Sequence, residues 1–368
     1  MFPVITFVHL KIYRVKNLLL FLSFAITTNA FCQFTLIPDQ NFELALFVRG
    51  FDDILDDGQV LTANISSITY LNITYEGIAD LTGIQAFTLL DTLNCSGNYL
   101  LSLDVSQNAA LISLQCDNNP LPSLDVSNNL ALKKLSCNRN QLTSLDVTQN
   151  TNLTGLWCKG FNATGGIGNN LTEIDVSQNT ALTNLVIGGN SLTTLDVSQN
   201  LALDALICGD NLLTNLDVTN NQALTHLSCD YNQLTTLDLS QNITLEHLDC
   251  DNNQLECLNV QNGSNLNFTL QAAFDATSNP NLTCITVDDV NYSTANWTVS
   301  GDEIDPQTSF STNCGDACTV GVSELNSEVS KKLTRIIDLT GREIQYQKNI
   351  MMLYIYDDGS SERVIEIE

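Results

Sequence analysis

Cysteine is the residue type whose spacing first suggests chemistry in this chain. Cysteines recur in steps of 21 residues, with one gap, at Cys95, Cys116, Cys137, Cys158, Cys208, Cys229 and Cys250. Neighbouring thiols in register could bind a metal or undergo redox chemistry. Each Cys, however, takes the place of an inward Leu of the repeat, and flat strand pairing does not offer disulfide geometry. We therefore expect free thiols that act as small buried hydrophobic residues.

A second group of candidates carries positive charge in a strongly acidic chain. The formal net charge is −27, and four of the five basic residues between positions 33 and 318 are Lys133, Lys134, Arg139 and Lys159. Side chains alternate along a strand, which places Lys134, Arg139 and Lys159 on the same face as Trp157. A Trp beside Arg and Lys is typical of a binding hot spot for a glycan, an acidic peptide or a protein. The alternative is that these cations only relieve repulsion within the acidic surface.

Two histidines form a weaker candidate, for zinc. His226 and His247 occupy the same outward column one coil apart, and Asp230, Asp249 and Asp251 lie close to them in the sequence. Imidazole and carboxylate groups are zinc ligands. Exposed histidines on an acidic face need no metal, however, so the pattern by itself assigns no metal site.

Calcium is a candidate at two places. Aspartates recur in the second half of each repeat, at positions 104, 125, 146, 175, 196, 217 and 238. The run 53–64 also resembles a calcium-binding loop, with Asp53, Asp57 and Gly58 correctly placed. The column lacks a cage of about six to eight oxygens, and Leu55 and Asn64 occupy ligand positions of the loop. We therefore expect no cofactor, with calcium as the open alternative.

The sequence contains no catalytic constellation. It has no elbow around a nucleophilic Ser, no Cys–His arrangement outside the repeat columns, and no paired carboxylates apart from the Asp column. The glycine-rich insert at 159–168 is not followed by Gly-Lys-Ser/Thr, which argues against a phosphate-binding loop. The acidic surface also repels nucleic acid and acidic lipids. We expect a protein that is not an enzyme.

All of these columns depend on a scaffold that repeats every 21 residues. Residues 132–151 show both halves of the repeat, Leu-x-x-Leu-x-Cys-x-x-Asn followed by Leu-x-x-Leu-Asp-Val-(Ser/Thr)-x-Asn. Each half predicts a short strand with its apolar side chains inward, so that stacked coils about 4.8 Å apart form two parallel sheets. The pattern predicts a β-rich solenoid.

Asparagines are expected to close the corners of the coils. Their amides can satisfy turn backbone groups that would otherwise be buried without a partner. The two columns are at 98, 119, 140, 169, 190, 211, 232 and 253, and at 108, 129, 150, 179, 200, 221 and 242. One coil is longer, because the glycine-rich insert adds residues that we expect to bulge as a loop.

The N-terminal region divides into two parts. Residues 1–32 carry Lys11, Arg14 and Lys16 before an apolar run at 18–26, which predicts a signal peptide, with a membrane anchor as the alternative. We therefore expect the mature chain to have no membrane span. Residues 33–80 predict a cap over the first coil. A short amphipathic helix after Pro38 and Asp39 is expected to carry its apolar residues at Phe42, Leu44, Ala45 and Phe47.

The solenoid is expected to occupy residues 81–260, followed by a C-terminal cap at 261–318. The cap region is rich in aromatic residues, and the disulfide candidates are Cys257, Cys284, Cys314 and Cys318. Three pairings are possible, and Cys257 with Cys284 is the first expectation. Residues 319–368 lose the Leu/Asn rhythm and alternate polar with apolar residues, which predicts a small β-rich unit.

These motifs resemble known families. The Leu/Asn pattern resembles bacterial leucine-rich repeat proteins of the internalin class, and the Leu-Asp-Val-Ser-x-Asn half with IPDQNFELAL at 37–46 is similar to surface proteins of Bacteroidota. Residues 331–368, with Gly-Arg-Glu followed by Tyr-Ile-Tyr-Asp-Asp-Gly, resemble C-terminal sorting signals of type IX secretion substrates, although this unit is short. The resemblance implies export across the outer membrane and removal of the terminal signal.

Together the patterns predict a secreted or outer-membrane surface protein with a leucine-rich repeat solenoid. Its expected function is adhesion or binding of a protein or glycan through Lys134, Arg139, Trp157 and Lys159, with the type IX secretion machinery as a second partner. A passive surface scaffold and an accessory module of a secreted hydrolase are the alternatives.

Overall fold

The computed structural model describes residues 33–160, 168–268 and 273–315, and the backbones of three strands at 333–337, 352–356 and 361–364. The predicted signal peptide, most of the glycine-rich insert, Cys318 and most of the predicted sorting unit lie outside the described residues. The chain divides into two units, Met1–Cys318 and Thr319–Glu368, which are described separately.

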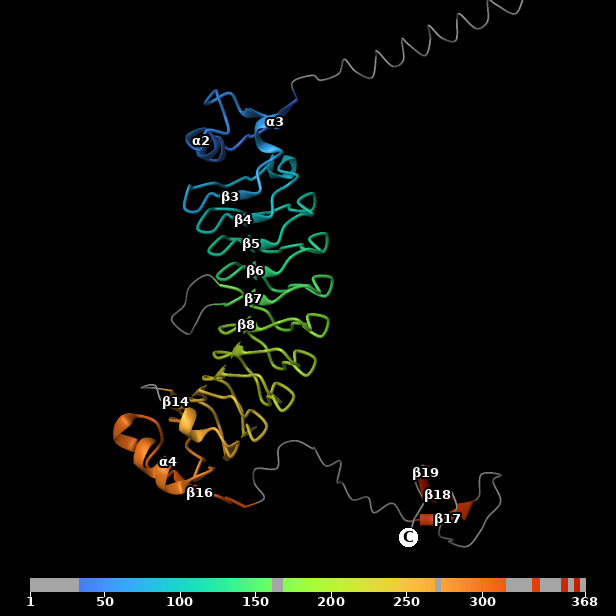
Figure 1. The fold of residues 1–368 in the computed structure, drawn as a ribbon, viewed down its shortest axis with the longest axis vertical. Coiled ribbons are helices and arrows are strands. Elements are labelled where there is room, and N and C mark those ends of the chain that lie inside the picture. The colour runs from blue at the N-terminus through green and yellow to red at the C-terminus, as the bar shows by residue number, and fades with distance from the viewer. Residues whose placement is uncertain are drawn as a thin grey trace, which may run out of the picture. The chain divides into compact units, whose positions relative to one another are not determined.

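The first half of each repeat forms one long parallel sheet, in which successive coils stack on one another (Figure 1). Its ten strands in spatial order are β3 (Tyr70–Asn72), β4 (Thr92–Asn94), β5 (Ser113–Gln115), β6 (Lys134–Ser136), β7 (Gly155–Trp157), β8 (Asn184–Val186), β9 (Ala205–Ile207), β10 (His226–Ser228), β12 (His247–Asp249) and β14 (Phe274–Asp275). Central residues pair in register, as Leu135 does with Leu156, and the side chains on either side of them point outward. This confirms the predicted solenoid of 21-residue coils.

The second half of the repeat forms a shorter sheet than predicted. Only β11 (Thr236–Asp238), β13 (Cys257–Asn259), β15 (Cys284–Thr286) and β16 (Ser309–Ser311) pair there. In earlier coils the carbonyl of Val126 accepts a hydrogen bond from the Asn150 amide at 3.0 Å, and the Asp146 carboxylate accepts the backbone N–H of Thr148 at 2.9 Å. Side chains thus satisfy the groups that a strand ladder would use.

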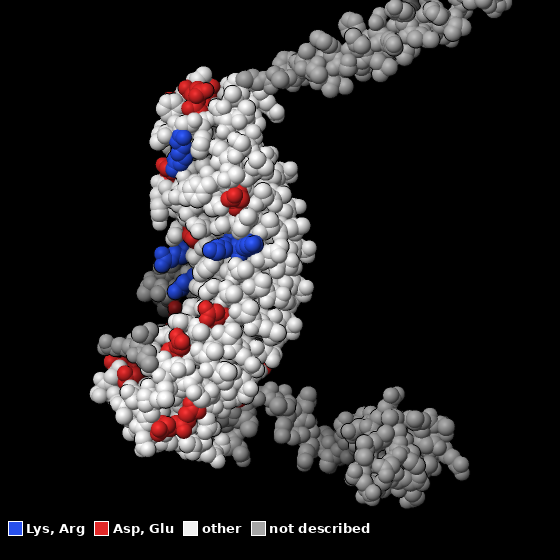
Figure 2. Space-filling view, viewed as in Figure 1, with Lys and Arg blue, Asp and Glu red and all other residues white. Residues whose placement is uncertain are grey.

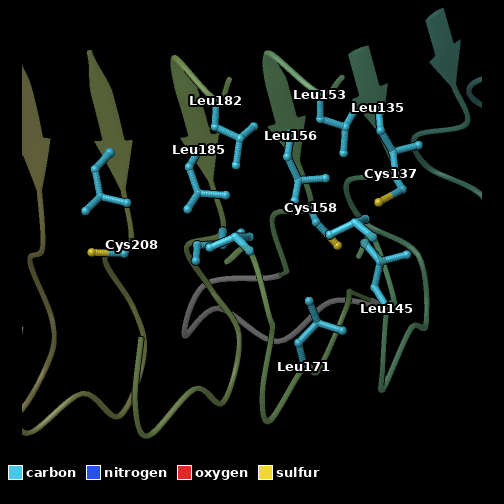
Figure 3. Packing of buried hydrophobic residues seen from close by; sticks show 14 of the residues in the cluster. Leu135, Cys137, Leu145, Leu153, Leu156, Cys158, Leu171, Leu182, Leu185 and Cys208 are labelled. Atoms are coloured by element: carbon cyan, nitrogen blue, oxygen red, sulfur yellow. The ribbon is translucent and has the colours of Figure 1, made fainter. Parts of the chain in front are cut away.

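The core is a column of apolar side chains between the two halves. Leu135, Cys137, Leu156 and Cys158 are 0% exposed, and their equivalents in neighbouring coils stack on them (Figure 3). Burying one Leu contributes about 1.5–3 kcal/mol. All seven cysteines of the column are buried free thiols, which confirms the prediction. Burial raises the pKa of Cys95 and of Cys208 to about 12, so these thiols are not reactive nucleophiles.

Both asparagine columns satisfy buried backbone groups, as predicted, and they also bridge successive coils. In the first column, the Asn232 amide donates to the carbonyls of Cys208 and Cys229, both at 3.1 Å, and its Oδ1 accepts the N–H of Leu213 at 2.9 Å. In the second column, the Asn221 amide donates to Val197 O at 3.0 Å and Asn200 O at 2.9 Å. Its Oδ1 has no hydrogen-bond partner among the described residues.

The N-terminal cap contains strands β1 (Phe34–Leu36) and β2 (Gln59–Leu61), which pair antiparallel, and helices α2 (Gln40–Val48) and α3 (Thr62–Ile65); the short helix η1 (Ile84–Ala86) follows strand β3. Asp39 caps α2 by accepting the N–H groups of Asn41 and Phe42. The predicted helix is confirmed, but its buried face was partly wrong. Phe42 and Ala45 are buried as expected, whereas Leu44 and Phe47 are exposed and Leu46 takes their place.

The region predicted as the C-terminal cap adds further coils to the solenoid. Leu258 pairs with Ile285 and Ile285 with Phe310, so β15 and β16 extend the stack. The spacing between equivalent residues of these coils is longer than the repeat of the earlier coils, so the repeat pattern did not predict them. The remaining helices are η2 (Asn265–Asn267), α4 (Val290–Asn296) and η3 (Val299–Gly301).

Aromatic side chains close this end of the core. Trp297 stacks on Phe274 with ring centroids 4.0 Å apart, and Phe268 and Phe310 lie against the same indole at 5.6 and 5.9 Å.

The first expectation for the disulfides was wrong. Cys284 pairs with Cys314, with Cα atoms 5.8 Å apart, and not with Cys257. Cys284 begins β15 and Cys314 follows β16, and these strands are parallel neighbours, which brings the two residues together. Cys257 is disulfide-bonded as well.

The second unit contains a three-stranded antiparallel sheet. Strand β18 (Met352–Tyr356) pairs with both β17 (Leu333–Ile337) and β19 (Ser361–Val364). Within the described parts of both units, no helix has the length and hydropathy needed to cross a membrane.

Candidate binding site

A pocket of about 270 Å³ opens on the outer face of the main sheet around Trp157. Its lining residues are Asp117, Asn118, Asn138, Arg139, Trp157, Lys159 and Val186. Three of the four residues predicted from the sequence, Arg139, Trp157 and Lys159, therefore meet in one pocket. Lys134 is exposed on β6, beside Gly155 of β7, but does not line it.

The Trp157 ring lies over Gly155 of the same strand. A Cβ atom at Gly155 would lie 2.3 Å from Trp157 Cη2 and 2.5 Å from Cζ3. Carbon atoms in contact keep about 3.5 Å or more. The ring therefore covers the space above Gly155, two residues earlier on the same strand and face. Glycine at 155 makes this orientation possible.

Arg139 occupies an unusual backbone position. Its φ is 52°, in the left-handed region, and its N–H donates to Lys159 O at 2.8 Å. The equivalent position is also left-handed in other coils, at Asn118 (φ 53°), Gly189 (φ 73°) and Tyr231 (φ 46°). The left-handed conformation costs a residue such as Arg about 1–2 kcal/mol more than Gly, and Asn less. The fold itself does not favour Arg here.

A hydrogen-bond network fixes the polar floor of the pocket. The Asp117 carboxylate accepts from Ser136 Oγ at 2.7 Å and from the Asn138 N–H at 2.6 Å. Asn138 Oδ1 accepts the N–H of Lys159 at 2.7 Å. These bonds hold the floor without using the charged ends of Arg139 or Lys159, which leaves both cations available for a ligand.

Within the described ranges, no ion pair reaches the cations at the pocket. In the described part of the chain, the one ion pair within 4.0 Å joins Arg49 and Glu76, in the N-terminal cap. Figure 2 shows several blue side chains near the middle of the solenoid, with red side chains beside them as well as toward both ends. Lys159 does act on Asp210, whose pKa is raised by burial and by Asp230 and is lowered by the Lys159 charge.

An apolar strip continues from the pocket along the outer face. Trp157, Val186 and Ile207 occupy the same outward position of three successive strands, in register, and all three are half-buried. Sequence reasoning missed Val186, Ile207, Asp117 and Asn138. Aligning the coils across the insert would have placed Val186 beside Trp157. Asp117, Asn138 and Lys159 follow one another at the 21-residue step, so the repeat places them in one column, but the spacing does not show the hydrogen bonds between them.

The histidines predicted as zinc candidates stack on each other instead of converging on carboxylates. The rings of His226 and His247 are 5.8 Å apart, and His226 Nδ1 contacts Thr225 Oγ1 at 2.8 Å. Asp249, the third weak metal candidate, instead approaches Asp230 and Asp251, with one oxygen of each carboxylate within 4.8 Å of the others. Burial and the neighbouring carboxylates raise the pKa of Asp249 to about 7.

The aspartate column of the second half caps its own turns. The Asp146 carboxylate accepts the hydroxyl of Thr148 at 2.7 Å as well as its N–H, and the N–H of Ser106 donates to Asp104 at 3.0 Å. Hydrogen bonds from Thr148 lower the pKa of Asp146. A wider hollow of about 530 Å³ between two of these turns is lined by Asp146, Glu173 and Asp175. In each case the Ser or Thr two residues after the aspartate supplies the donor.

The fold and its outer face define a leucine-rich repeat solenoid, the class to which the similar solved structures belong. The functional domain of InlJ from Listeria monocytogenes, described as including a cysteine ladder, is 28% identical with a TM-score of 0.50, and the match covers 76% of this chain and 70% of that one. No family model matches the sequence, and comparison with curated proteins finds no significant match.

Two further structures show the same fold at lower identity. Internalin C2 of L. monocytogenes is 21% identical with a TM-score of 0.52, covering 57% of this chain and 92% of that one. The ectodomain of the plant receptor kinase GASSHO1/SCHENGEN3 from Arabidopsis thaliana is 17% identical with a TM-score of 0.54, covering 67% and 33%.

Proposed function

We propose that this chain is a non-catalytic recognition protein that binds a protein or a glycan through the pocket at Trp157. The observation that carries the proposal is the convergence of Arg139, Trp157 and Lys159 in one pocket of an acidic protein, with no ion pair to either cation among the residues that the structure describes. A flat indole beside cationic groups favours a ligand with an apolar or sugar face and an anionic group.

The polar floor and the apolar strip support the same function. The network through Asp117 and Asn138 holds the pocket in shape before a ligand arrives, which lowers the entropy lost on binding. Val186 and Ile207 extend the contact surface beside the indole. Among proteins with this fold, the plant ectodomain was solved in complex with CASPARIAN STRIP INTEGRITY FACTOR 2, so the fold can hold a partner.

The proposed site of action is outside the cell. A signal peptide at 1–32 and a type IX sorting unit at 319–368 would export the chain, with the secretion machinery as a partner and with release or attachment at the outer-membrane surface. The domain plan proposed with it is an N-terminal cap at 33–80, the solenoid at 81–260 and a C-terminal cap at 261–318.

The test is a glycan and surface-protein array probed with the secreted chain, followed by affinity measurements on the partner found. Trp157→Ala is expected to weaken binding about 30-fold or more, as for a hot-spot aromatic, and Lys159→Glu about tenfold. Arg139→Asn removes the guanidinium while keeping a residue that tolerates the left-handed backbone.

Lys133→Glu is the matched control. It makes the same charge change on the neighbouring coil, at an exposed residue that does not line the pocket. Equal affinity for Trp157→Ala and the native chain would place recognition elsewhere. Absence of any bound partner would favour the passive scaffold, and turnover of a polysaccharide or protein would favour the hydrolase accessory role.

A further inference from the structure

Three carboxylates meet in the N-terminal cap. One oxygen each of Glu43, Asp52 and Asp57 lie within 4.8 Å of one another. Glu43 belongs to helix α2 and is 1% exposed, Asp52 follows that helix and is 8% exposed, and Asp57 precedes β2. Two of the three charged groups are therefore nearly removed from water, where a charge without compensation is costly.

The hydrogen bonds of the group leave one oxygen without a partner. Glu43 Oε1 accepts the N–H groups of Asp57 and Gly58, both at 2.9 Å, and Asp57 Oδ1 accepts the N–H of Gln59 at 3.1 Å. Asp52 Oδ1 has only a long contact of 3.4 Å from the N–H of Ile54. Asp52 Oδ2 is buried and has no hydrogen-bond partner in the described part of the chain.

No basic side chain neutralises the group. The nearest cation in the sequence, Arg49, donates to Ala45 O at 2.7 Å and pairs with Glu76 at 2.7 Å. No ion pair within 4.0 Å reaches Glu43, Asp52 or Asp57 among the described residues. Burial first, and then the charges of Asp57 and Asp53, raise the pKa of Asp52. Among the described residues, no positive charge therefore compensates these three carboxylates.

We propose that Glu43, Asp52 and Asp57 bind a calcium ion in the N-terminal cap. Calcium accepts carboxylate, carbonyl and water oxygens in irregular geometry, whereas magnesium requires a near-ideal octahedron and zinc prefers nitrogen and sulfur. The bound ion would tie helix α2 to the loop before β2 and stiffen the cover of the first coil. Only Asp57 is shared with the loop at 53–64 considered from the sequence, because Glu43 comes from the helix.

The experiment titrates calcium chloride into the full chain after treatment with EDTA. Calorimetry is expected to show binding in the range of about 0.1–1 mM typical of extracellular modules, and calcium should raise the melting temperature. Asp52→Asn should weaken calcium binding at least about tenfold, because it removes a charged ligand. Asp53→Asn is the matched control, since the same change falls next to Asp52 in the chain but outside the group.

Folding of the Asp52→Asn variant can be checked independently. In EDTA it should melt at or above the temperature of the native chain, because the change removes a buried like charge. Three results would overturn the proposal: no heat and no change in melting temperature up to about 5 mM calcium, equal affinity in the native and Asp52→Asn chains, or magnesium binding as tightly as calcium.

Discussion

The two asparagine columns have the same residue and the same spacing, yet they should respond differently to truncation. We consider Asn232→Ala in the first column and Asn221→Ala in the second. Asn221 is 0% exposed and Asn232 is 7% exposed, so both changes remove a buried amide. The difference lies in the side-chain oxygen, which accepts the N–H of Leu213 in Asn232 and accepts nothing from the described residues in Asn221.

The expected costs follow from the groups left behind. Asn221→Ala removes two hydrogen bonds, but Val197 O still accepts the N–H of Asn200 and Asn200 O that of Leu203. At about 0.5–1.5 kcal/mol per bond, the loss is about 1–3 kcal/mol. Asn232→Ala also leaves the buried N–H of Leu213 without an acceptor, which adds about 1–3 kcal/mol. The first column should therefore be the more sensitive one.

Urea unfolding followed by circular dichroism measures the two free energies. Hydrogen exchange supplies a local readout, since the amide of Leu213 should lose protection in Asn232→Ala and keep it in Asn221→Ala. Equal destabilisation of the two variants, together with unchanged protection of Leu213, would refute the reasoning. Coils of a solenoid can unfold in steps, so the comparison uses variants in adjacent coils.

Two further predictions concern the outer face. Gly155→Ala should displace the Trp157 ring, because a Cβ atom would lie 2.3 Å from it, with little loss of stability. In a Trp297→Phe background, iodide should then quench the fluorescence of Trp157 more strongly. The pKa of Asp249 is raised to about 7, so the folded state binds this proton more tightly than the unfolded state. Stability should therefore fall as pH rises from about 5 to 8, and Asp249→Asn should reduce this dependence.

Each of these has a clear contrary result. Unchanged iodide quenching in the Gly155→Ala chain would mean that the ring does not lie over residue 155. Melting temperatures of the native and Asp249→Asn chains that vary identically between pH 5 and 8 would mean that Asp249 does not titrate there. The Asp146 and Asp104 carboxylates do not interfere, because their pKa values are lowered and lie below this window.

Much of the candidate site was predictable, and the reason is the repeat itself. Lys134, Arg139, Trp157 and Lys159 could be assigned to one face because strand alternation is local. Which of them share a pocket was not predictable. The Trp157 ring turns back over Gly155 of its own strand, and Arg139 lies on a left-handed corner whose N–H donates to Lys159 of the next coil.

The ends of the chain were harder to predict because they do not repeat. The C-terminal coils have longer and unequal spacings, so β15 and β16 and the Cys284–Cys314 bond became visible only in the folded chain. In the N-terminal cap, Leu46 is buried in place of Leu44 and Phe47. Phe42 of that helix stacks on Phe87, so the direction in which the helix faces depends on a contact with a residue far along the chain.

The sequence by itself determined the solenoid, the free buried thiols and the bridging asparagines, since a 21-residue period admits few other folds and places like residues in columns. Only the tertiary structure decided which side chains outside the columns meet. It brought Glu43 of a helix to Asp52 and Asp57 of a loop. The physical reason is that a column follows from local periodicity, whereas such a cluster depends on how irregular segments pack.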